Sequence, residues 1–245
     1  MTRRMMILTG CFFFRLVISV QPSILLIEGN IGVGKSTFLS MLHSYLPELT
    51  MISEPCSDWQ DVSGHNLLAA FYKDAARWSC TMQLYALMTF LRKMQKIIDD
   101  NASSNLFVME RSLYSCRYCF ATHLYAIGCM NDLEWALYTD AWNWYITHFP
   151  KPIGIIYLRA DPEICYERMK LRARNEESVV PLSYLKMLHE RHERWLMLKE
   201  QSSYNIPVLE IDASCNFKDD KEQQKQIISQ ILDFLKNQEN TIFTR

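Results

Sequence analysis

Residues 24–37 read ILLIEGNIGVGKST, a short apolar run followed by three glycines within six positions and then by Lys35 and Ser36. The chain holds only 7 glycines in 245 residues, so this crowding marks a place where the backbone takes conformations that side chains exclude. The pattern G-x-x-x-x-G-K-S between a strand and a helix is typical of a loop whose backbone N–H groups bind phosphate. It predicts binding of ATP or GTP with Mg²⁺.

Within this loop each position has an expected task. Lys35 reaches the β- and γ-phosphates, the Ser36 hydroxyl is suited to Mg²⁺, and the following helix adds its positive N-terminus. The residues expected at phosphate are Gly29, Asn30, Ile31, Gly32, Val33, Gly34, Lys35, Ser36 and Thr37. The loop alone does not separate a kinase from a switch GTPase or a motor protein.

Five apolar runs, separated by segments of helical length, predict an α/β fold with a doubly wound, five-stranded parallel sheet. The runs are Ile24–Glu28, Met51–Glu54, Leu106–Glu110, Ile153–Leu158 and Val208–Ile211. Residues 66–99 have the length and period of one or two long helices, and residues 219–237 carry the single apolar stripe of a packing helix. No repeat or long linker interrupts the chain, so we expect one domain over residues 23–240.

Composition restricts the class of protein. Hydrophobic residues make up 49% and charged residues 22%, which is ordinary for a globular protein. The net charge of −1 gives no electrostatic footprint for nucleic acid or an anionic membrane, so neither is expected as a partner. Eight cysteines are too sparse for a disulfide scaffold, and the lone Cys116-x-x-Cys119 has no second pair, which favours reduced intracellular thiols over a zinc or redox site.

Residues 1–22 differ from the rest of the chain. Arg3, Arg4 and Arg15 interrupt or precede apolar stretches, and no acidic residue occurs before Glu28. Arg15 argues against a secretory signal and against a membrane span. The two remaining interpretations are a mitochondrial presequence and an unstructured extension, so the expected location is intracellular, in the cytoplasm or the mitochondrion.

Charged residues end the first three apolar runs. Ligands of open α/β sheets bind at the carboxyl ends of the strands, so Glu28, Glu54 and Glu110, with Arg111, should share one site. Glu54 could take the proton of an acceptor hydroxyl, Glu110 could hold Mg²⁺ through water, and Arg111 could steady a transferring phosphoryl group. The alternatives are a capping or ion-paired Glu54 and a structural Glu–Arg network.

A group of arginines precedes Asn175. Arg168 and Arg172 lie four residues apart on one helical face, with Arg174 just beyond, and like charges at this spacing repel. A bound anion would remove that cost, which predicts an arginine-bearing lid over the transferring phosphate at residues 168–180. The alternative is a solvated basic face.

Taken in order, these stretches resemble the deoxynucleoside kinase family over residues 23–235. The resemblance is carried by IEGNIGVGKST (27–37), SEP (53–55), WQ (59–60), RWSCTMQ (77–83), ERSLYSCRYCF (110–120), LRADPEICYERMKLRARNEE (158–177) and PLSYLKMLHERHERWL (181–196). It implies a P-loop nucleoside-kinase fold, transfer of phosphate from ATP with Mg²⁺ to the 5′-hydroxyl of a deoxynucleoside, and a homodimer.

The same resemblance implies roles for individual residues. Glu54 is similar to the family's base at the 5′-hydroxyl, with Arg111 beside it. Gln83 resembles the amide that pairs with the nucleobase, and Phe120 resembles the aromatic residue that stacks on it, while Trp59 lines the same pocket. From position alone, these aromatic residues would more often belong to the core.

Further matches concern the sugar and the donor nucleotide. Tyr72 and Glu177 resemble the pair that holds the sugar 3′-hydroxyl. Arg168 and Arg172 resemble arginines that cover ATP, and Phe217 resembles the residue near the ATP base.

Two positions depart from part of the family. Deoxycytidine-type and deoxyguanosine-type members carry an Arg and an Asp where this chain has Phe90 and Cys116. The more apolar pair resembles the mitochondrial thymidine-kinase type and the broad insect type. It predicts a preference for thymidine and deoxycytidine over purine nucleosides.

Two other classes of function compete with this prediction. One is a non-catalytic structural subunit of the same fold, of the respiratory complex I accessory type. The other is a nucleoside monophosphate kinase, which would need an additional acceptor-phosphate site. A switch GTPase is disfavoured because no Asn-Lys-x-Asp motif is present.

Overall fold

A computed structural model describes residues 22–102, 104–200, 205–215 and 217–243, with side chains described as far as residue 238. The interpretation of residues 1–22 as a leader falls almost wholly outside this part of the chain. The elements are β1 (Ser23–Gly29), α1 (Lys35–Tyr45), β2 (Thr50–Ile52), α2 (Cys56–Gln60), α3 (Leu67–Lys73), α4 (Ala75–Asp100), β3 (Leu106–Glu110), α5 (Leu113–Ser115), η1 (Cys116–Ala121), α6 (Thr122–Ala126), α7 (Asp132–His148), β4 (Pro152–Arg159), α8 (Pro162–Arg172), η2 (Asn175–Val179), α9 (Leu182–His192), η3 (Glu193–Met197), β5 (Val208–Asp212) and α10 (Lys221–Phe243).

The sheet has five parallel strands in the order β2-β3-β1-β4-β5, which confirms the predicted fold class. Strand β1 lies at its centre, with Ile27 opposite Glu110 of β3 and Glu28 opposite Tyr157 of β4. The carboxyl ends of β1 and β3 therefore meet at one edge. The second predicted strand is shorter than expected, because β2 ends at Ile52 and leaves Glu54 in the loop that follows.

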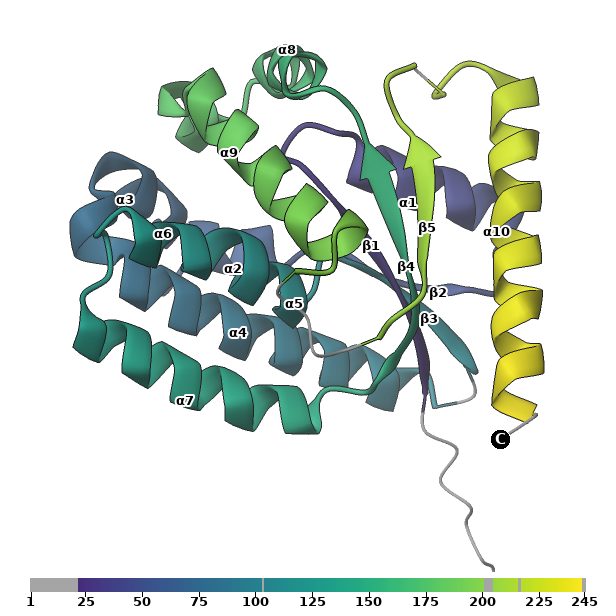
Figure 1. Ribbon diagram of the computed structural model, residues 1–245, viewed down its shortest axis with the longest axis horizontal. Helices are drawn as coiled ribbons and strands as arrows, with labels where there is room; N and C mark the ends of the chain where they lie inside the picture. The colour runs from purple at the N-terminus through teal and green to yellow at the C-terminus, as the bar shows by residue number, and fades with distance from the viewer. Residues whose placement is uncertain (1–21, 103, 201–204, 216, 244–245) are drawn as a thin grey trace, which may run out of the picture.

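Helices cover both faces of the sheet (Figure 1). Helices α1 and α10 pack against each other and against the strands on one face, while α4 and α7 pack side by side on the other. The predicted helical region 66–99 is divided into α3 and α4, because Asp74 ends one helix and caps the next by accepting a hydrogen bond from the backbone N–H of Arg77.

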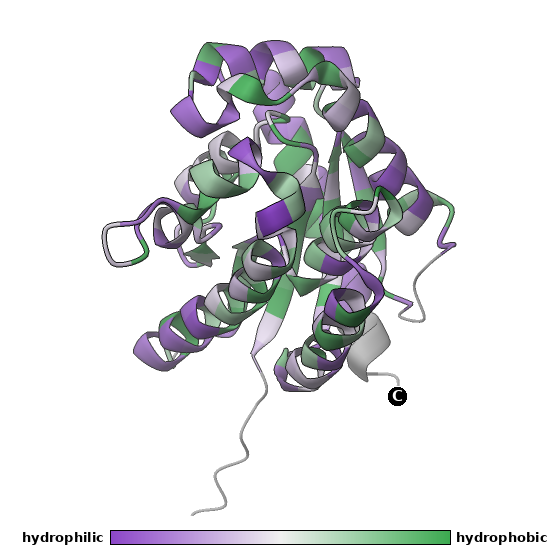
Figure 2. Cartoon of the chain, turned by 90° about the vertical axis from the view of Figure 1, so that its left-hand side faces the viewer, coloured by the Kyte–Doolittle hydropathy of each residue, from purple (hydrophilic) through white to green (hydrophobic). Residues whose placement is uncertain are grey.

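Hydrophobic side chains concentrate between these layers (Figure 2). Ile24, Leu25, Leu26 and Ile27 of β1 are all fully buried, as expected for a strand covered on both faces. No helix in the described ranges is both long and apolar enough to cross a membrane.

Candidate active site

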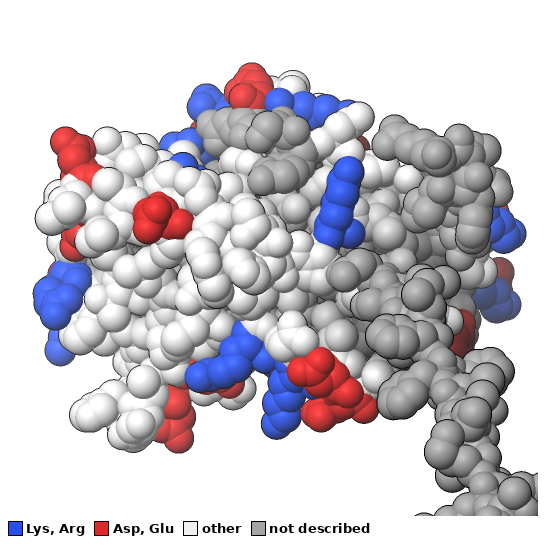
Figure 3. Space-filling model, turned by 90° about the horizontal axis from the view of Figure 1, so that it is seen from below, with Lys and Arg blue, Asp and Glu red and all other residues white. Residues whose placement is uncertain are grey.

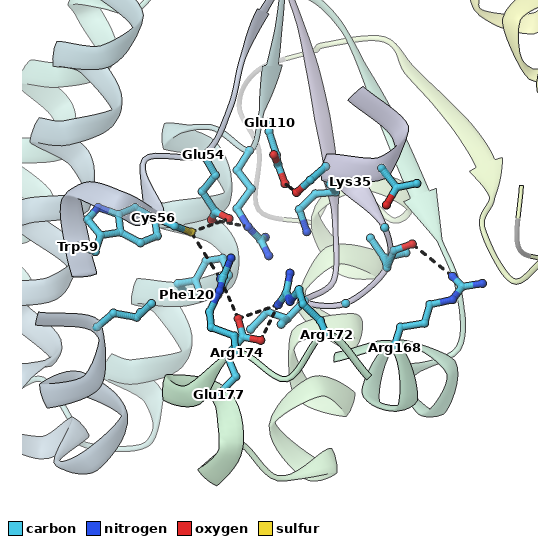
Figure 4. A pocket seen from close by; sticks show the side chains of 18 of the residues that line it. Lys35, Glu54, Cys56, Trp59, Glu110, Phe120, Arg168, Arg172, Arg174 and Glu177 are labelled. Carbon is cyan, nitrogen blue, oxygen red and sulfur yellow. Dashed lines mark hydrogen bonds and ion pairs between the residues drawn. The ribbon is translucent and has the colours of Figure 1, made fainter. Parts of the chain in front are cut away.

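A cavity of about 600 Å³ opens at the carboxyl ends of β1 and β3 (Figure 4). Most of the residues predicted from the sequence line it. They are Ile31, Gly32, Val33, Gly34, Lys35, Ser36, Thr37, Glu54, Trp59, Tyr72, Gln83, Phe90, Glu110, Arg111, Cys116, Phe120, Arg168, Arg172, Glu177 and Phe217. This volume lies within the range of small-molecule sites in proteins, which is roughly 300–1,000 Å³.

The phosphate loop requires its glycines. Gly32 has a φ of +80°, and a Cβ atom there would collide with the carbonyl oxygen of Cys165 in α8. At Gly29, with a φ of +145°, a Cβ atom would lie 2.6 Å from the carbonyl oxygen of Leu158. Both positions therefore combine a left-handed backbone with a close approach to neighbouring chain, and only glycine allows both.

Lys35 lies buried beneath this loop. Its ammonium donates to the carbonyl oxygens of Gly29 at 3.1 Å and Asn30 at 2.7 Å. Burial and the nearby Arg111 lower the pKa of Lys35 to about 8, although the surrounding carboxylates oppose that shift. Gly29 and Asn30 are the two predicted loop residues that do not line the cavity, and the Asn30 side chain instead donates to the carbonyl oxygen of Leu185 in α9.

The two predicted magnesium ligands lie in contact. The Ser36 hydroxyl donates to Oε1 of Glu110 at 2.9 Å, so both oxygens face the same point beside the loop. No cluster of three or more His, Cys, Asp or Glu suited to a metal occurs among the described residues. Oxygen donors fit Mg²⁺, which is commonly held by one or two protein oxygens together with phosphate oxygens and water. The residues present therefore fit Mg²⁺ delivered with a nucleotide.

Glu54 and Arg111 form an ion pair in the middle of the cavity. Nε of Arg111 lies 2.8 Å from Oε1 of Glu54, and Nη1 donates to the carbonyl oxygen of Gly29 at 3.1 Å. Burial alone would raise the pKa of Glu54, but the positive charges of Arg111 and Lys35 outweigh it and hold that pKa below its usual value. Glu54 is therefore ionised at neutral pH. The guanidinium of Arg111 also lies 4.9 Å from the ring centre of Phe120.

Beyond this pair, the cavity ends among apolar side chains and one amide. Trp59 donates to Thr89 at 2.9 Å, and its ring meets Phe90 edge to face at 5.8 Å. Cys116 and Phe120 reach the cavity from the π-helix η1, a local widening of the helix that is frequent at functional sites. Oε1 of Gln83 is buried and has no hydrogen-bond partner in the described structure. A buried amide oxygen without a partner is costly, so this atom is free to accept a hydrogen bond from a donor in the cavity.

The arginines separate into two groups (Figure 4). Arg168 lies beside the phosphate loop and donates to the carbonyl oxygen of Val33 at 3.3 Å, as well as to those of Ala213 at 2.6 Å and Ser214 at 2.9 Å. Arg172 and Arg174 both bind the buried carboxylate of Glu177, at 2.5 and 2.9 Å. In this structure the carboxylate of Glu177 therefore lies between Arg172 and Arg174, and backbone carbonyl oxygens bind Arg168, at the positions where the sequence led us to expect a bound anion.

Glu177 and Tyr72, which the resemblance pairs at the sugar, both line the cavity. At the opposite end, Phe217 packs edge to face on Phe38 at 5.8 Å and closes the loop side of the cavity.

The sequence interpretation assigned no role to two further lining residues. Cys56 donates to Oε2 of Glu54 at 3.4 Å, and burial together with Glu54 raises the pKa of this thiol. Tyr184 of α9 lines the cavity near Arg111. Tyr184 stands in the PLSY stretch, which carries part of the family resemblance and no separate signal for a role in the site. Seven free cysteines occur in the described residues, and Cys215 is the exposed one among them.

A phosphate loop facing an ionised carboxylate across one cavity defines a phosphate-transferring kinase. A model of the deoxynucleoside kinase family matches residues 25–236. The chain is 40% identical over 211 residues to a probable deoxycytidine kinase of fowlpox virus, covering 85% of this chain and 86% of the relative. It is 38% identical over 235 residues to deoxycytidine kinase of Bos taurus, with 85% and 89% covered, and 36% identical over 221 residues to mitochondrial thymidine kinase 2 of Macaca fascicularis, with 90% and 80% covered. The chain belongs to the deoxynucleoside kinase family.

Proposed function

We propose that this kinase transfers the γ-phosphoryl group of ATP, with Mg²⁺, to the 5′-hydroxyl of deoxynucleosides and prefers thymidine and deoxycytidine. The observation that carries the proposal is the Glu54–Arg111 pair, which lies against the phosphate loop in the same cavity that Gln83, with its unpartnered amide oxygen, also lines. A nucleoside held by Gln83 would direct its sugar toward Glu54 and its 5′-hydroxyl toward the phosphate loop.

The ionised Glu54 would accept a hydrogen bond from the 5′-hydroxyl and take its proton during transfer. Arg111 and Lys35 supply positive charge on the side of the transferring phosphoryl group, where charge in a buried site is most effective. Ser36 and Glu110 would hold Mg²⁺, which neutralises charge on the phosphates. The residues of this chain thus orient the two substrates and balance charge, which is most of what phosphoryl transfer requires.

Sugar and donor recognition complete the proposal. Tyr72 and Glu177 would hold the 3′-hydroxyl, with Glu177 retaining one of its arginines. Close packing beneath the 2′-carbon would disfavour a hydroxyl that finds no partner there. Arg172, released from Glu177, could then turn to the phosphates, so that the segment at 168–180 acts as a lid.

Preference for a pyrimidine follows from the far end of the cavity. Phe90 is 1% and Cys116 is 4% exposed, and burial raises the pKa of the Cys116 thiol, so it stays neutral. Neither residue offers a charge to the polar edge of a purine, and their apolar surfaces suit the methyl group of thymine. The relatives named above include both deoxycytidine kinases and a thymidine kinase, which supports acceptance of the two pyrimidine nucleosides.

The test is an ATP- and Mg²⁺-dependent assay that compares thymidine, deoxycytidine, deoxyadenosine and deoxyguanosine, with Lys35→Ala as the inactive control. We expect turnover of the two pyrimidine nucleosides that is lost in the control. Faster turnover of deoxyguanosine than of either pyrimidine would refute the pocket argument. Thymidine monophosphate belongs in the same assay, because its turnover alone would favour a monophosphate kinase, and no turnover at all would favour a structural subunit.

Two copies of the chain would associate through α4 and α7. Leu133, Leu137 and Trp144 lie on one face of α7 and are 69%, 54% and 57% exposed, and Met88 of α4 is exposed as well. Figure 3 views the molecule from the side of α7 and shows a broad area without charge. A homodimer would bury this area. Leu137→Glu should convert a dimer into a monomer in analytical ultracentrifugation, whereas Leu198→Glu, at an equally exposed leucine elsewhere, should leave it unchanged.

A further inference from the structure

Glu28 is a buried carboxyl group to which the proposed reaction gives no task. It stands at the end of β1, directly before the phosphate loop, and is fully inaccessible to solvent. Its Oε2 atom has no hydrogen-bond partner among the described residues. Burial raises the pKa of Glu28 to about 7, against the pull of Ser112 and Arg111. An apolar side chain would be less costly here, so the carboxyl group calls for an explanation.

The contact that Glu28 makes leads to the next strand. The Ser112 hydroxyl donates to Oε1 of Glu28 at 2.5 Å, a short bond between two fully buried side chains. The same Ser112 oxygen accepts from the backbone N–H groups of Tyr114 and Ser115 and so caps α5. Ser112 is thereby fixed on both sides, by β1 and by the helix that it begins.

The residue between β3 and this fixed serine is Arg111. Its φ is +63°, in the left-handed region, which is unfavourable for a residue that carries a side chain. Its backbone N–H donates to the carbonyl oxygen of Ile27 at 2.9 Å, so the chain is held on the strand side as well. This conformation turns the guanidinium toward Glu54 instead of continuing the strand. Without the fixed Ser112 after it, the backbone at Arg111 would lower its free energy by relaxing to the extended region.

We propose that Glu28 is a positioning residue for phosphoryl transfer: its hydrogen bond to Ser112 holds Arg111 in the left-handed conformation that places the guanidinium against Glu54. The inference rests on the proposed function, because it assumes that Arg111 and Glu54 face the transferring group. Glu28 itself contacts neither substrate. Its effect passes through one hydrogen bond and one strained residue.

The test compares Glu28→Ala, Glu28→Gln and Ser112→Ala in the full chain, with kcat, the KM for thymidine and ATP affinity measured for each. Displacing a catalytic group by about 1 Å costs on the order of 100-fold in rate. We expect Glu28→Ala and Ser112→Ala to lower kcat by about 10- to 100-fold, with the KM for thymidine and the ATP affinity within threefold of the unsubstituted chain. Glu28→Gln keeps an oxygen that can accept from Ser112 and should retain kcat within about threefold.

Two further measurements exclude a merely structural effect. The double variant Glu28→Ala/Ser112→Ala should lose no more kcat than the worse single variant, because both changes remove one hydrogen bond. Tyr157→Phe is the control. Tyr157 lies opposite Glu28 in β4, and the substitution removes its hydrogen bond to Glu193. We expect kcat to stay unchanged.

Each outcome decides the matter. An unchanged kcat in Ser112→Ala would overturn the proposal. This substitution leaves no large cavity, so the test remains available even if Glu28→Ala fails to fold. A loss in Glu28→Gln as large as that in Glu28→Ala would also overturn the proposal, as would losses that multiply in the double variant. If the unsubstituted chain phosphorylates no nucleoside, the proposed function itself is refuted. If the unsubstituted chain is active and all three substitutions leave kcat unchanged, only the positioning role of Glu28 is refuted.

Discussion

Replacing Glu54 by Gln tests the centre of the proposed mechanism. The substitution keeps the shape of the side chain and removes its charge, so Arg111 loses the ion pair at 2.8 Å. Loss of a general base costs typically 10²–10⁴-fold, so we expect kcat to fall by that factor, or about 2.7–5.4 kcal/mol of transition-state stabilisation. ATP binding should be retained, because the phosphate loop is untouched.

The same substitution has a separate effect on stability. The Arg111 side chain is only 4% exposed and keeps its hydrogen bond to Gly29. Leaving a buried charge less well paired costs about 1–3 kcal/mol, which corresponds to a Tm lower by roughly 2–12 °C in a chain of this size. Thermal unfolding followed by circular dichroism would measure this change independently of kcat.

Glu193→Gln is a matched control for this prediction. Glu193 is 21% exposed, against 18% for Glu54, and it pairs with Arg159 at 2.9 Å outside the cavity. Its Tm should fall slightly while kcat stays within twofold of the unsubstituted chain. The assay is steady-state release of ADP with saturating thymidine, together with calorimetric titration of ATP. If Glu54→Gln retained kcat within threefold, the proton acceptor would have to be another group and the reasoning would be refuted.

Three further substitutions test other parts of the structure. Gly32→Ala should abolish measurable ATP binding in calorimetry, because its Cβ would collide with the Cys165 carbonyl; normal affinity would contradict the loop geometry. Lys35→Met should lower kcat at least about 100-fold, and a loss below tenfold in the ADP-release assay would rule out a major role for this charge. Burial lowers the pKa of His192 to about 3 from an ordinary 6.5, so the unfolded chain takes up the proton first and stability falls as the pH drops below 6.5. Between pH 7 and pH 5 the unsubstituted chain should lose about 2 kcal/mol more unfolding free energy than His192→Phe in urea titrations, and equal losses would contradict the assignment.

The sheet and the phosphate loop were predictable because short-range pattern determines them. Buried parallel strands need continuous apolar runs, and the loop needs glycines at fixed positions. The run Ile24–Glu28 and the residues after it therefore predict both the first strand and the phosphate loop. The end of β2 was not predictable to the residue. Met51–Glu54 reads as one extended run, but only Thr50, Met51 and Ile52 find partners on β3.

The arrangement of charges in the site was less predictable. The sequence places Arg168 and Arg172 on one helix, but it does not show that the chain after β5 passes close enough for its carbonyl oxygens to bind Arg168. Nor does it show that Glu177 turns back onto Arg172 and Arg174. Such contacts depend on distances between segments far apart in the chain, which local pattern does not contain. The left-handed conformation of Arg111 likewise cannot be predicted from the sequence Glu110-Arg111-Ser112.

The exposed thiol of Cys215 offers a way to follow nucleotide occupancy. It lines the cavity on the side of Phe217 and Lys218, whereas the other described cysteines are buried or half-buried. Alkylation by a maleimide dye should therefore be faster at Cys215 than at the other described cysteines, and a bound nucleotide would shield it from the reagent. The rate of labelling, read by mass spectrometry of the peptide, would then report the donor side of the cavity without any turnover.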